Sequence, residues 1–163
     1  MDAVCDLIGT IAKYTKQSMA TYFETFYPLL LKFTKSSRSH SDRAMAIGCI
    51  GEVIGELGPG AMKYVETMLP VAMENLQDAM EGVRRNSAFC IGMFVQSLGK
   101  ALAPTHFAQI LHALYPLCAL QVTVSGATNS GGADADNAIS TVAHMVRAGL
   151  PEHIPLSQVQ NSS

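Results

Sequence analysis

The chain repeats a pattern at a spacing of 41 residues. The stretches SDRAMAIGCIGEVIGELG, from Ser41, and DAMEGVRRNSAFCIGMFVQSLG, from Asp78, align without gaps across their apolar halves. Gly92 lies 41 positions after Gly51, and Arg84 lies 41 positions after Arg43. Units of this length cannot bury an apolar face alone, so the repeat predicts an array of stacked units.

Within each unit, apolar residues recur at every third or fourth position, which indicates amphipathic helices. We expect first helices at residues 3–14, 44–57, 82–98 and 136–146, and second helices at residues 19–33, 61–76 and 105–120. Each second helix contains a proline, at Pro28, Pro70 and Pro116. A proline inside a helix kinks it, so the shared position predicts a shared shape.

These helix pairs predict an all-α fold, a HEAT- or armadillo-like α-solenoid of stacked antiparallel helix pairs. The expected organisation is repeat 1 at 1–37, repeat 2 at 38–78, repeat 3 at 79–122, a flexible Gly/Ser loop at 123–133, and a partial repeat 4 with a tail at 134–163. The loop lengthens the spacing, so that Asn137 aligns with Asn86 at an offset of 51.

Small residues recur at one position of the first helices, at Gly51, Gly92 and Ala143. We expect this position to pack tightly against a neighbouring helix, because a larger side chain there would force the layers apart.

Composition limits the classes of partner. The formal net charge of -2 offers no electrostatic basis for binding nucleic acid or an anionic membrane. Charged residues make up 15% of the chain, against roughly 25% in typical soluble domains. Much of the surface is therefore expected to be buried, within the chain or against neighbouring units.

One segment is a candidate for a membrane span, because no Lys, Arg, Asp or Glu occurs between positions 100 and 134. A spanning helix needs about 20 predominantly apolar residues. His106, Gln109, His112 and two prolines interrupt this segment, so we expect an amphipathic helix packed on one face. The acidic start MDAVCDLIG also predicts no secretory signal peptide.

The four cysteines are widely spaced and form no CxxC pair. This spacing argues against a zinc knuckle or a thioredoxin-type site. We expect small buried thiols and a reducing compartment.

Arg84 and Arg85 lie early in a predicted helix, where a phosphate is one possible ligand. The alternative that we favour is structural. In HEAT-type units an acidic residue of the turn and an arginine early in the first helix bridge adjacent repeats, and Asp78 and Arg84 have that spacing. The predicted inter-repeat ladder consists of Asp78, Arg84, Asn86 and Asn137.

Other motifs give no case for catalysis. GELGPG lacks the Lys and Ser/Thr of a phosphate-binding loop. DADN, at positions 134–137, lacks the spacing of a calcium loop and is expected to be a solvated turn. The five histidines form no HExxH motif. We therefore predict no enzyme activity, no catalytic residue, no metal and no cofactor. Nine methionines are expected to fill core, or in part to form an adaptable binding surface.

The stretches SDRAMAIGCIGEVIGELG, LPVAMENLQDAMEGVRRNSAFCIGMFVQSLG and DNAISTVAHMV resemble the carboxy-terminal HEAT repeats of importin-β-type karyopherins. The likeness covers about residues 39–158. Family members are several times longer and have a shorter loop before Asp134. The resemblance therefore implies a fragment or a truncated product.

The resemblance also implies a function. Such receptors bind protein cargo with their second helices and accept phenylalanine-glycine nucleoporins between their first helices. The Ran GTPase, bound through amino-terminal repeats, releases the cargo. The implied location is the cytoplasm, the nucleus and the pore of the nuclear envelope.

Polar residues on the second helices are weak candidates for the cargo face: Lys63, Glu66, Glu74, His106 and Gln109. A solvated surface without a ligand is the alternative for each of them. The periodicity equally fits a HEAT-repeat scaffold that holds a protein complex together without transport. A regulatory helical domain would require a catalytic partner on the same chain.

Overall fold

The computed structural model describes residues 2–124 and 132–149, and within these ranges the chain is helical and contains no strand. The first repeat consists of α1 (Asp2–Thr15), the 3-10 segment η1 (Lys16–Ser18) and α2 (Met19–Phe33). The second consists of α3 (His40–Leu57), η2 (Gly58–Tyr64) and α4 (Val65–Asn75). The third consists of α5 (Glu81–Leu98), η3 (Gly99–Ala101) and α6 (Pro104–Val124), and α7 (Ala133–Arg147) follows it.

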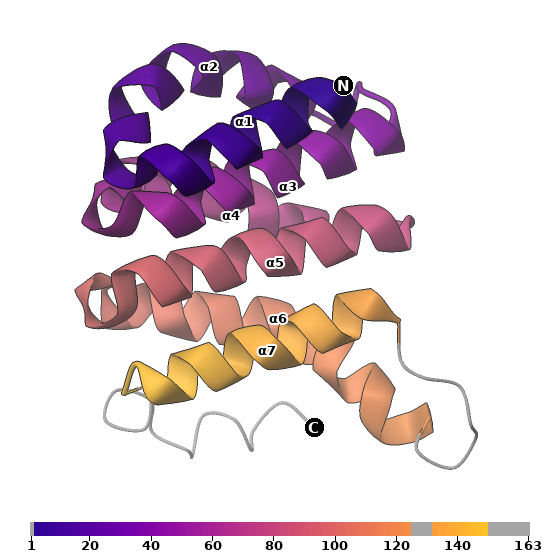
Figure 1. Cartoon of the computed structure of the whole chain (residues 1–163). Coiled ribbons are helices and arrows are strands. Elements are labelled where there is room, and N and C mark those ends of the chain that lie inside the picture. Colours follow the sequence, from indigo (N-terminus) through magenta and orange to yellow (C-terminus); the bar gives the residue numbers. More distant parts are fainter. Residues whose placement is uncertain (1, 125–131, 150–163) are drawn as a thin grey trace.

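The helices form two layers (Figure 1). The first helices α1, α3, α5 and α7 lie side by side in one layer, and the second helices α2, α4 and α6 form the other. Pro28, Pro70 and Pro116 lie inside α2, α4 and α6 respectively. A single buried cluster of apolar side chains extends through the described repeats. The fold is therefore the expected all-α solenoid of stacked helix pairs.

The turns between paired helices repeat a backbone conformation. Gly58 has φ +53° and Gly99 has φ +47°, and each ends a first helix. Residues with side chains rarely adopt such positive φ values, and glycine adopts them without strain.

Several helix boundaries differ from those expected; α3, for example, begins at His40 and not at residue 44. The second helix of repeat 2, expected over residues 61–76, begins with the 3-10 segment η2, and regular α4 starts only at Val65. The chain turns at Gly58 and enters the 3-10 segment η2 at once, with Pro59 in its first turn.

Both ends of the expected loop at 123–133 are helical. Helix α6 extends to Val124, and α7 begins at Ala133. The centre of that loop and the expected tail after residue 149 lie outside the described residues.

An aromatic cluster joins the second layer of repeats 1 and 2. The ring of Tyr64 lies 5.0 Å from that of Phe23 and 4.7 Å from that of Tyr27, between ring centroids. The hydroxyl of Tyr27 also hydrogen-bonds that of Thr67 at 2.5 Å. Edge-to-face aromatic pairs of this kind add about 0.5–1.5 kcal/mol beyond the burial of their area. The cluster therefore fixes how α2 and the η2–α4 segment stack.

Candidate functional site

A buried ion pair links the start of α3 to the turn before α5. The guanidinium of Arg43, on α3, pairs with the carboxylate of Asp78 in the turn before α5, and both side chains are less than one-tenth exposed. Arg43 also donates from Nη2 to the Asn75 side-chain oxygen at 2.8 Å. Burial alone would raise the pKa of Asp78. The hydrogen bonds from the Met80 N–H and Arg43, together with the charge of Arg43, outweigh burial and lower this pKa.

A second ion pair joins α5 to α7. Arg84 donates from Nε to the carboxylate of Asp134, at the start of α7, over 2.7 Å. Its Nη1 donates to the backbone carbonyls of Asp78 and Ala79, at 2.9 and 3.0 Å. Each arginine therefore reaches forward to an acid that lies either just before the next first helix (Asp78) or in its first turn (Asp134).

This arrangement corrects two expectations. The Asp78 carboxylate pairs with Arg43 and not with Arg84, because the turn before α5 lies against the start of α3. Asp134 was expected in a solvated turn, but its side chain is 6% exposed because Arg84 covers it. Arg43 lies 41 positions before Arg84, at the spacing of the repeat, and this equivalence is the feature of the sequence that could have predicted an ion pair for Arg43.

The two asparagines of the predicted ladder bind helix backbone. Asn86 donates from Nδ2 to the carbonyl of Ala44 at 2.6 Å, and Asn137 donates from Nδ2 to the carbonyl of Arg85 at 3.1 Å. Each side chain thus ties one first helix to the preceding first helix.

Two hydroxyls that the sequence did not single out form similar bonds. Ser97 donates to the carbonyl of Ile54 at 2.9 Å, and Thr141 donates to that of Ala88 at 3.0 Å. Serine and threonine commonly bond to the carbonyl of their own helix. Sequence spacing alone therefore does not distinguish bonds of this kind from bonds to a neighbouring helix.

The glycines of the first helices lie at close approaches between repeats. A Cβ at Gly51 would lie 3.0 Å from the Cα of Cys90 and 3.1 Å from the Phe89 ring, and one at Gly92 would lie 2.7 Å from Oγ1 of Thr141. Ala143, expected at the same kind of contact, is instead exposed. Its position faces away from α5, and no further first helix covers it in the described part of the chain.

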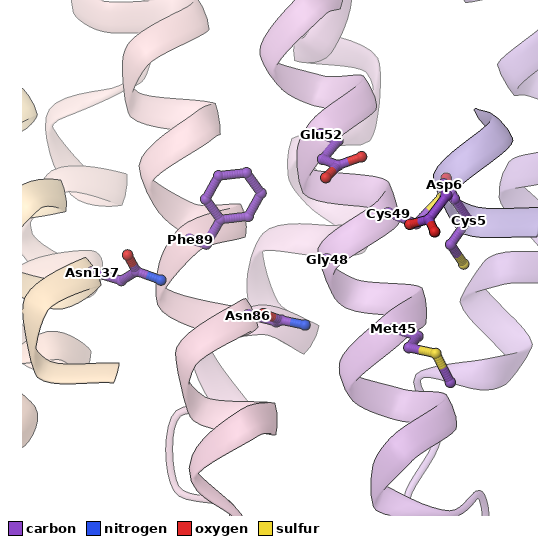
Figure 2. A pocket seen from close by; sticks show the side chains of 9 residues that line it. All are labelled: Cys5, Asp6, Met45, Gly48, Cys49, Glu52, Asn86, Phe89 and Asn137. Atoms are coloured by element: carbon purple, nitrogen blue, oxygen red, sulfur yellow. The ribbon is translucent and has the colours of Figure 1, made fainter. Parts of the chain in front are cut away.

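The layer of first helices contains a cavity of about 340 Å³ (Figure 2). Its walls come from α1, α3, α5 and α7, and the ring of Phe89 projects from α5 towards α3. Apolar or sulfur-containing groups line part of it and polar groups line the rest: Cys5, Met45, Gly48, Cys49 and Phe89, with Asp6, Glu52, Asn86 and Asn137.

The cargo-face candidates lie on the second layer, and several pair with each other or across repeats. Lys63 pairs with Glu24 of α2 at 2.6 Å, and His106 lies 3.4 Å from Glu66. These pairs connect successive second helices. Gln109 is exposed on α6, and Glu74 is exposed near the end of α4.

A larger cavity of about 740 Å³ opens where α2 and α4 end, beside the start of α3. Glu74 lines it, as do Lys35, Arg43 and Asp78. Arg43 and Asp78 neutralise each other, and Lys35 and Glu74 carry opposite charges, so this hollow has mixed charge.

The two layers and their inter-repeat bonds can be compared with known proteins. A sequence model of the family described as "Importin subunit beta-1-like, TPR repeats" matches residues 1–130 of the chain. The chain belongs to this importin-β family. The description names tetratricopeptide repeats, whose usual length is about 34 residues, whereas the spacing here is in the range of HEAT-type units.

Individual importins are also similar to this importin-family chain. A protein described as "Probable importin subunit beta-4" of Schizosaccharomyces pombe is 28% identical over 159 residues, which is 98% of the chain and 14% of that protein. "Importin-4" of Mus musculus is 35% identical over 102 residues, and "Importin-4" of Homo sapiens is 34% identical over the same length. These matches cover 63% of the chain and 9% of either mammalian protein. The chain therefore spans about one-seventh or less of these relatives.

The importin-family chain has no cluster of three or more His, Cys, Asp or Glu side chains that is arranged to hold a metal ion within its described ranges. Those ranges also contain no helix that is long and apolar enough to span a membrane. The thiols of Cys5, Cys49 and Cys90 are buried and that of Cys118 is half-buried. Burial raises the pKa of Cys90 to about 12, and it also raises the pKa of Cys49 and Cys118.

Proposed function

We propose that this chain is a segment of a nuclear import receptor that binds protein cargo and phenylalanine-glycine nucleoporins. Its membership of the importin-β family, and the names of its relatives, support the receptor class. The observation that carries the nucleoporin site is the cavity between the first helices, because the resemblance expects phenylalanine side chains in that layer. We propose no chemical step, so function rests on binding alone.

The cavity suits one aromatic side chain better than a cofactor. Its volume of about 340 Å³ is at the low end of the roughly 300–1,000 Å³ that is usual for ligand pockets. Phe89 offers a ring for an offset or edge-to-face aromatic contact. Met45 supplies a flexible sulfur-containing wall. Gly48 has no side chain, which leaves room for the Asn86 amide to lie close against α3 at the wall of the cavity.

The polar rim offers partners for a peptide backbone. Asn86 uses Nδ2 in its bond to Ala44, so its side-chain oxygen is the group that accepts a further hydrogen bond. Asn137 likewise uses Nδ2 to bond Arg85. A phenylalanine-glycine dipeptide presents one ring and a backbone that glycine leaves accessible. The cavity therefore combines the contacts that such a dipeptide requires.

For cargo we propose the layer of second helices, including the hollow beside Glu74. The mixed charges of that hollow fit a polar protein segment better than a nucleic acid. Release of the cargo by Ran-GTP belongs to the full-length receptor, through repeats amino-terminal to this segment. The corresponding location is the cytoplasm, the nucleus and the nuclear pore.

The test is retention of the chain on immobilised phenylalanine-glycine nucleoporin repeats. A matched resin carries the same repeats with each Phe changed to Ser. The proposal expects retention on the Phe resin and loss from the Ser resin. If a folded, soluble chain fails to bind either resin, the nucleoporin site is refuted, and the scaffold reading is then favoured.

A further inference from the structure

The cavity between the first helices has an acidic rim. Two carboxylates line it, Asp6 from α1 and Glu52 from α3, and both residues are exposed. Among the described residues, no lysine, arginine or histidine lines this cavity. In the view of Figure 2, the carboxylate of Glu52 lies between that of Asp6 and the ring of Phe89. A ligand that enters the cavity therefore meets an aromatic ring and two negative charges.

No cation of the described residues neutralises this rim. Within residues 2–124 and 132–149, the ion pairs join lysine, arginine or histidine to other acids: Glu24, Glu56, Glu66, Asp78 and Asp134. Asp6 and Glu52 belong to none of these pairs. Like charges that face one cavity repel each other, and an opposite charge placed between them is favoured. The rim therefore attracts a positively charged group.

The close contact of α1 with α3 determines where Glu52 lies. A Cβ at Gly9 of α1 would overlap Oε2 of Glu52. The side chain of Glu52 therefore lies against α1, where any residue larger than glycine would displace it. Gly9 follows Asp6 by three residues, so the two positions are neighbours on one face of α1. The absence of a side chain at Gly9 thus allows both carboxylates to lie on the same side of the contact.

The negative charge also affects the buried wall of the cavity. Cys49 lines the cavity and is 3% exposed. Burial raises the pKa of its thiol, and Cys5, Glu52 and Asp6 raise this pKa further. The two carboxylates disfavour a negative charge on the thiol for the same electrostatic reason that they favour a positive charge on a ligand.

A cationic side chain fits this rim better than a metal ion. Ca²⁺ takes 6–8 oxygen ligands, and the described residues contain no cluster of three or more side chains arranged to hold a metal. An ammonium or guanidinium group donates hydrogen bonds directly to carboxylates. Either group is also attracted to an aromatic ring within about 6 Å. Phe89, Asp6 and Glu52 together therefore suit a peptide that carries a lysine or an arginine.

We propose that the cavity selects phenylalanine-glycine segments in which a lysine or an arginine adjoins the phenylalanine. The phenylalanine ring packs on Phe89, and the cationic side chain pairs with Asp6 and Glu52. An acidic residue in the same place is repelled. This inference rests on the proposed nucleoporin site and adds the charge that the site prefers beside the aromatic ring.

The test compares immobilised peptides that contain the same number of Phe-Gly units. The residues on both sides of each unit are Lys, Ser or Glu, and a fourth, Phe-free peptide has Lys flanks with each Phe changed to Ser. The double variant Asp6→Asn/Glu52→Gln removes both charges of the rim with little change in shape. Glu24→Gln/Glu56→Gln is the matched control, because it removes two charges outside the cavity, each from an ion pair with a lysine. Circular dichroism checks that every variant is folded.

The wild-type chain and the control should bind the Lys-flanked peptide roughly three- to ten-fold more tightly than the Ser-flanked peptide, which is the range for exposed charge pairs. The Glu-flanked peptide should bind more weakly still. These differences should shrink as salt rises from about 0.05 M to about 0.5 M, because salt screens exposed charges. The double variant Asp6→Asn/Glu52→Gln should bind the Lys-flanked and Ser-flanked peptides equally and should still require phenylalanine.

The contrary results separate this inference from the proposed function. If the wild-type chain binds all three flanked peptides equally but not the Phe-free peptide, charge selection is overturned and the nucleoporin site stands. Equal loss of the Lys preference in both double variants overturns the assignment to Asp6 and Glu52, and indicates an effect of net charge alone. If a folded chain binds no peptide, or binds the Phe-free peptide as tightly as the Lys-flanked peptide, both the inference and the nucleoporin site are overturned.

Discussion

The carboxylate of Asp78, in the turn before α5, pairs with Arg43 of α3, while Arg84 of α5 pairs with Asp134 at the start of α7. Each arginine sits early in a first helix, and each acid sits just before the next first helix or in its first turn. The two pairs form consecutive steps of one ladder. Because neighbouring repeats touch only each other, such pairs help to set the angle between units.

Replacing Asp78 with Asn should destabilise the fold, because a buried guanidinium loses its counter-charge. The expected loss in the free energy of unfolding is about 2 kcal/mol, within the range for hydrogen bonds to charged groups. Urea unfolding monitored by circular dichroism measures it. Asp6→Asn, an exposed carboxylate on α1, serves as the control and should change the midpoint little.

The difference between wild type and Asp78→Asn should also depend on pH. The pKa of Asp78 is lower in the folded chain than its ordinary value, which is about 3.9 in the unfolded state. The stabilisation is therefore complete above that value and disappears as the pH falls through the folded pKa. A difference that grows as the solution is acidified would contradict this assignment.

Gly51→Ala should destabilise the interface between α3 and α5, since the added Cβ meets the Cα of Cys90 at 3.0 Å. Overpacking of this kind costs about 1–3 kcal/mol. Gly82→Ala is the control, because a Cβ at Gly82 meets nothing within 4 Å. Because alanine has a greater helix propensity than glycine, the Gly82→Ala variant should be as stable as the wild type or more stable by up to about 1 kcal/mol. Equal unfolding midpoints for the two variants would refute the close approach.

Gly92→Leu should be more disruptive, because a Cβ at Gly92 would already lie 2.7 Å from Thr141 Oγ1. Overpacking predicts a loss of about 3 kcal/mol or more. Ala143→Leu makes a comparable change at the equivalent position, which is exposed. Thermal unfolding at low protein concentration should separate the two variants clearly, and a Gly92→Leu midpoint equal to that of the wild type would be the contrary result.

The buried thiols should resist modification while the chain is folded. A thiol reacts as its thiolate, and burial raises the pKa of Cys90 to about 12 and also raises that of Cys49. A disulfide reagent at a pH of about 8 should therefore reach Cys118, which is half-buried, before Cys49 and Cys90. Peptide mapping measures the order, and rapid labelling of Cys90 without denaturant would contradict the burial.

The repeat and its helix pairs could be predicted from sequence, because the apolar spacing and the offset between Gly51 and Gly92 are local patterns. Partners across the repeats were harder to predict. The Asp78–Arg43 pair was missed because periodicity shows which residues are equivalent but not which neighbouring repeat each one reaches. Ala143 was assigned to a packed position by equivalence alone, but it is exposed, and no helix of the described residues covers it. Asp134 was assigned to a solvated turn because its distant partner, Arg84, is invisible to local spacing.

Retention of cavity variants on phenylalanine-glycine nucleoporin repeats tests the central claim most directly. Met45→Glu places a charge in the cavity between the first helices. Met62→Glu makes the same change on η2, at a side chain that is 40% exposed and lies outside that cavity. The account predicts that the Phe resin retains Met62→Glu as it retains the wild-type chain, and that it loses a folded Met45→Glu. Equal retention of both variants would contradict the account.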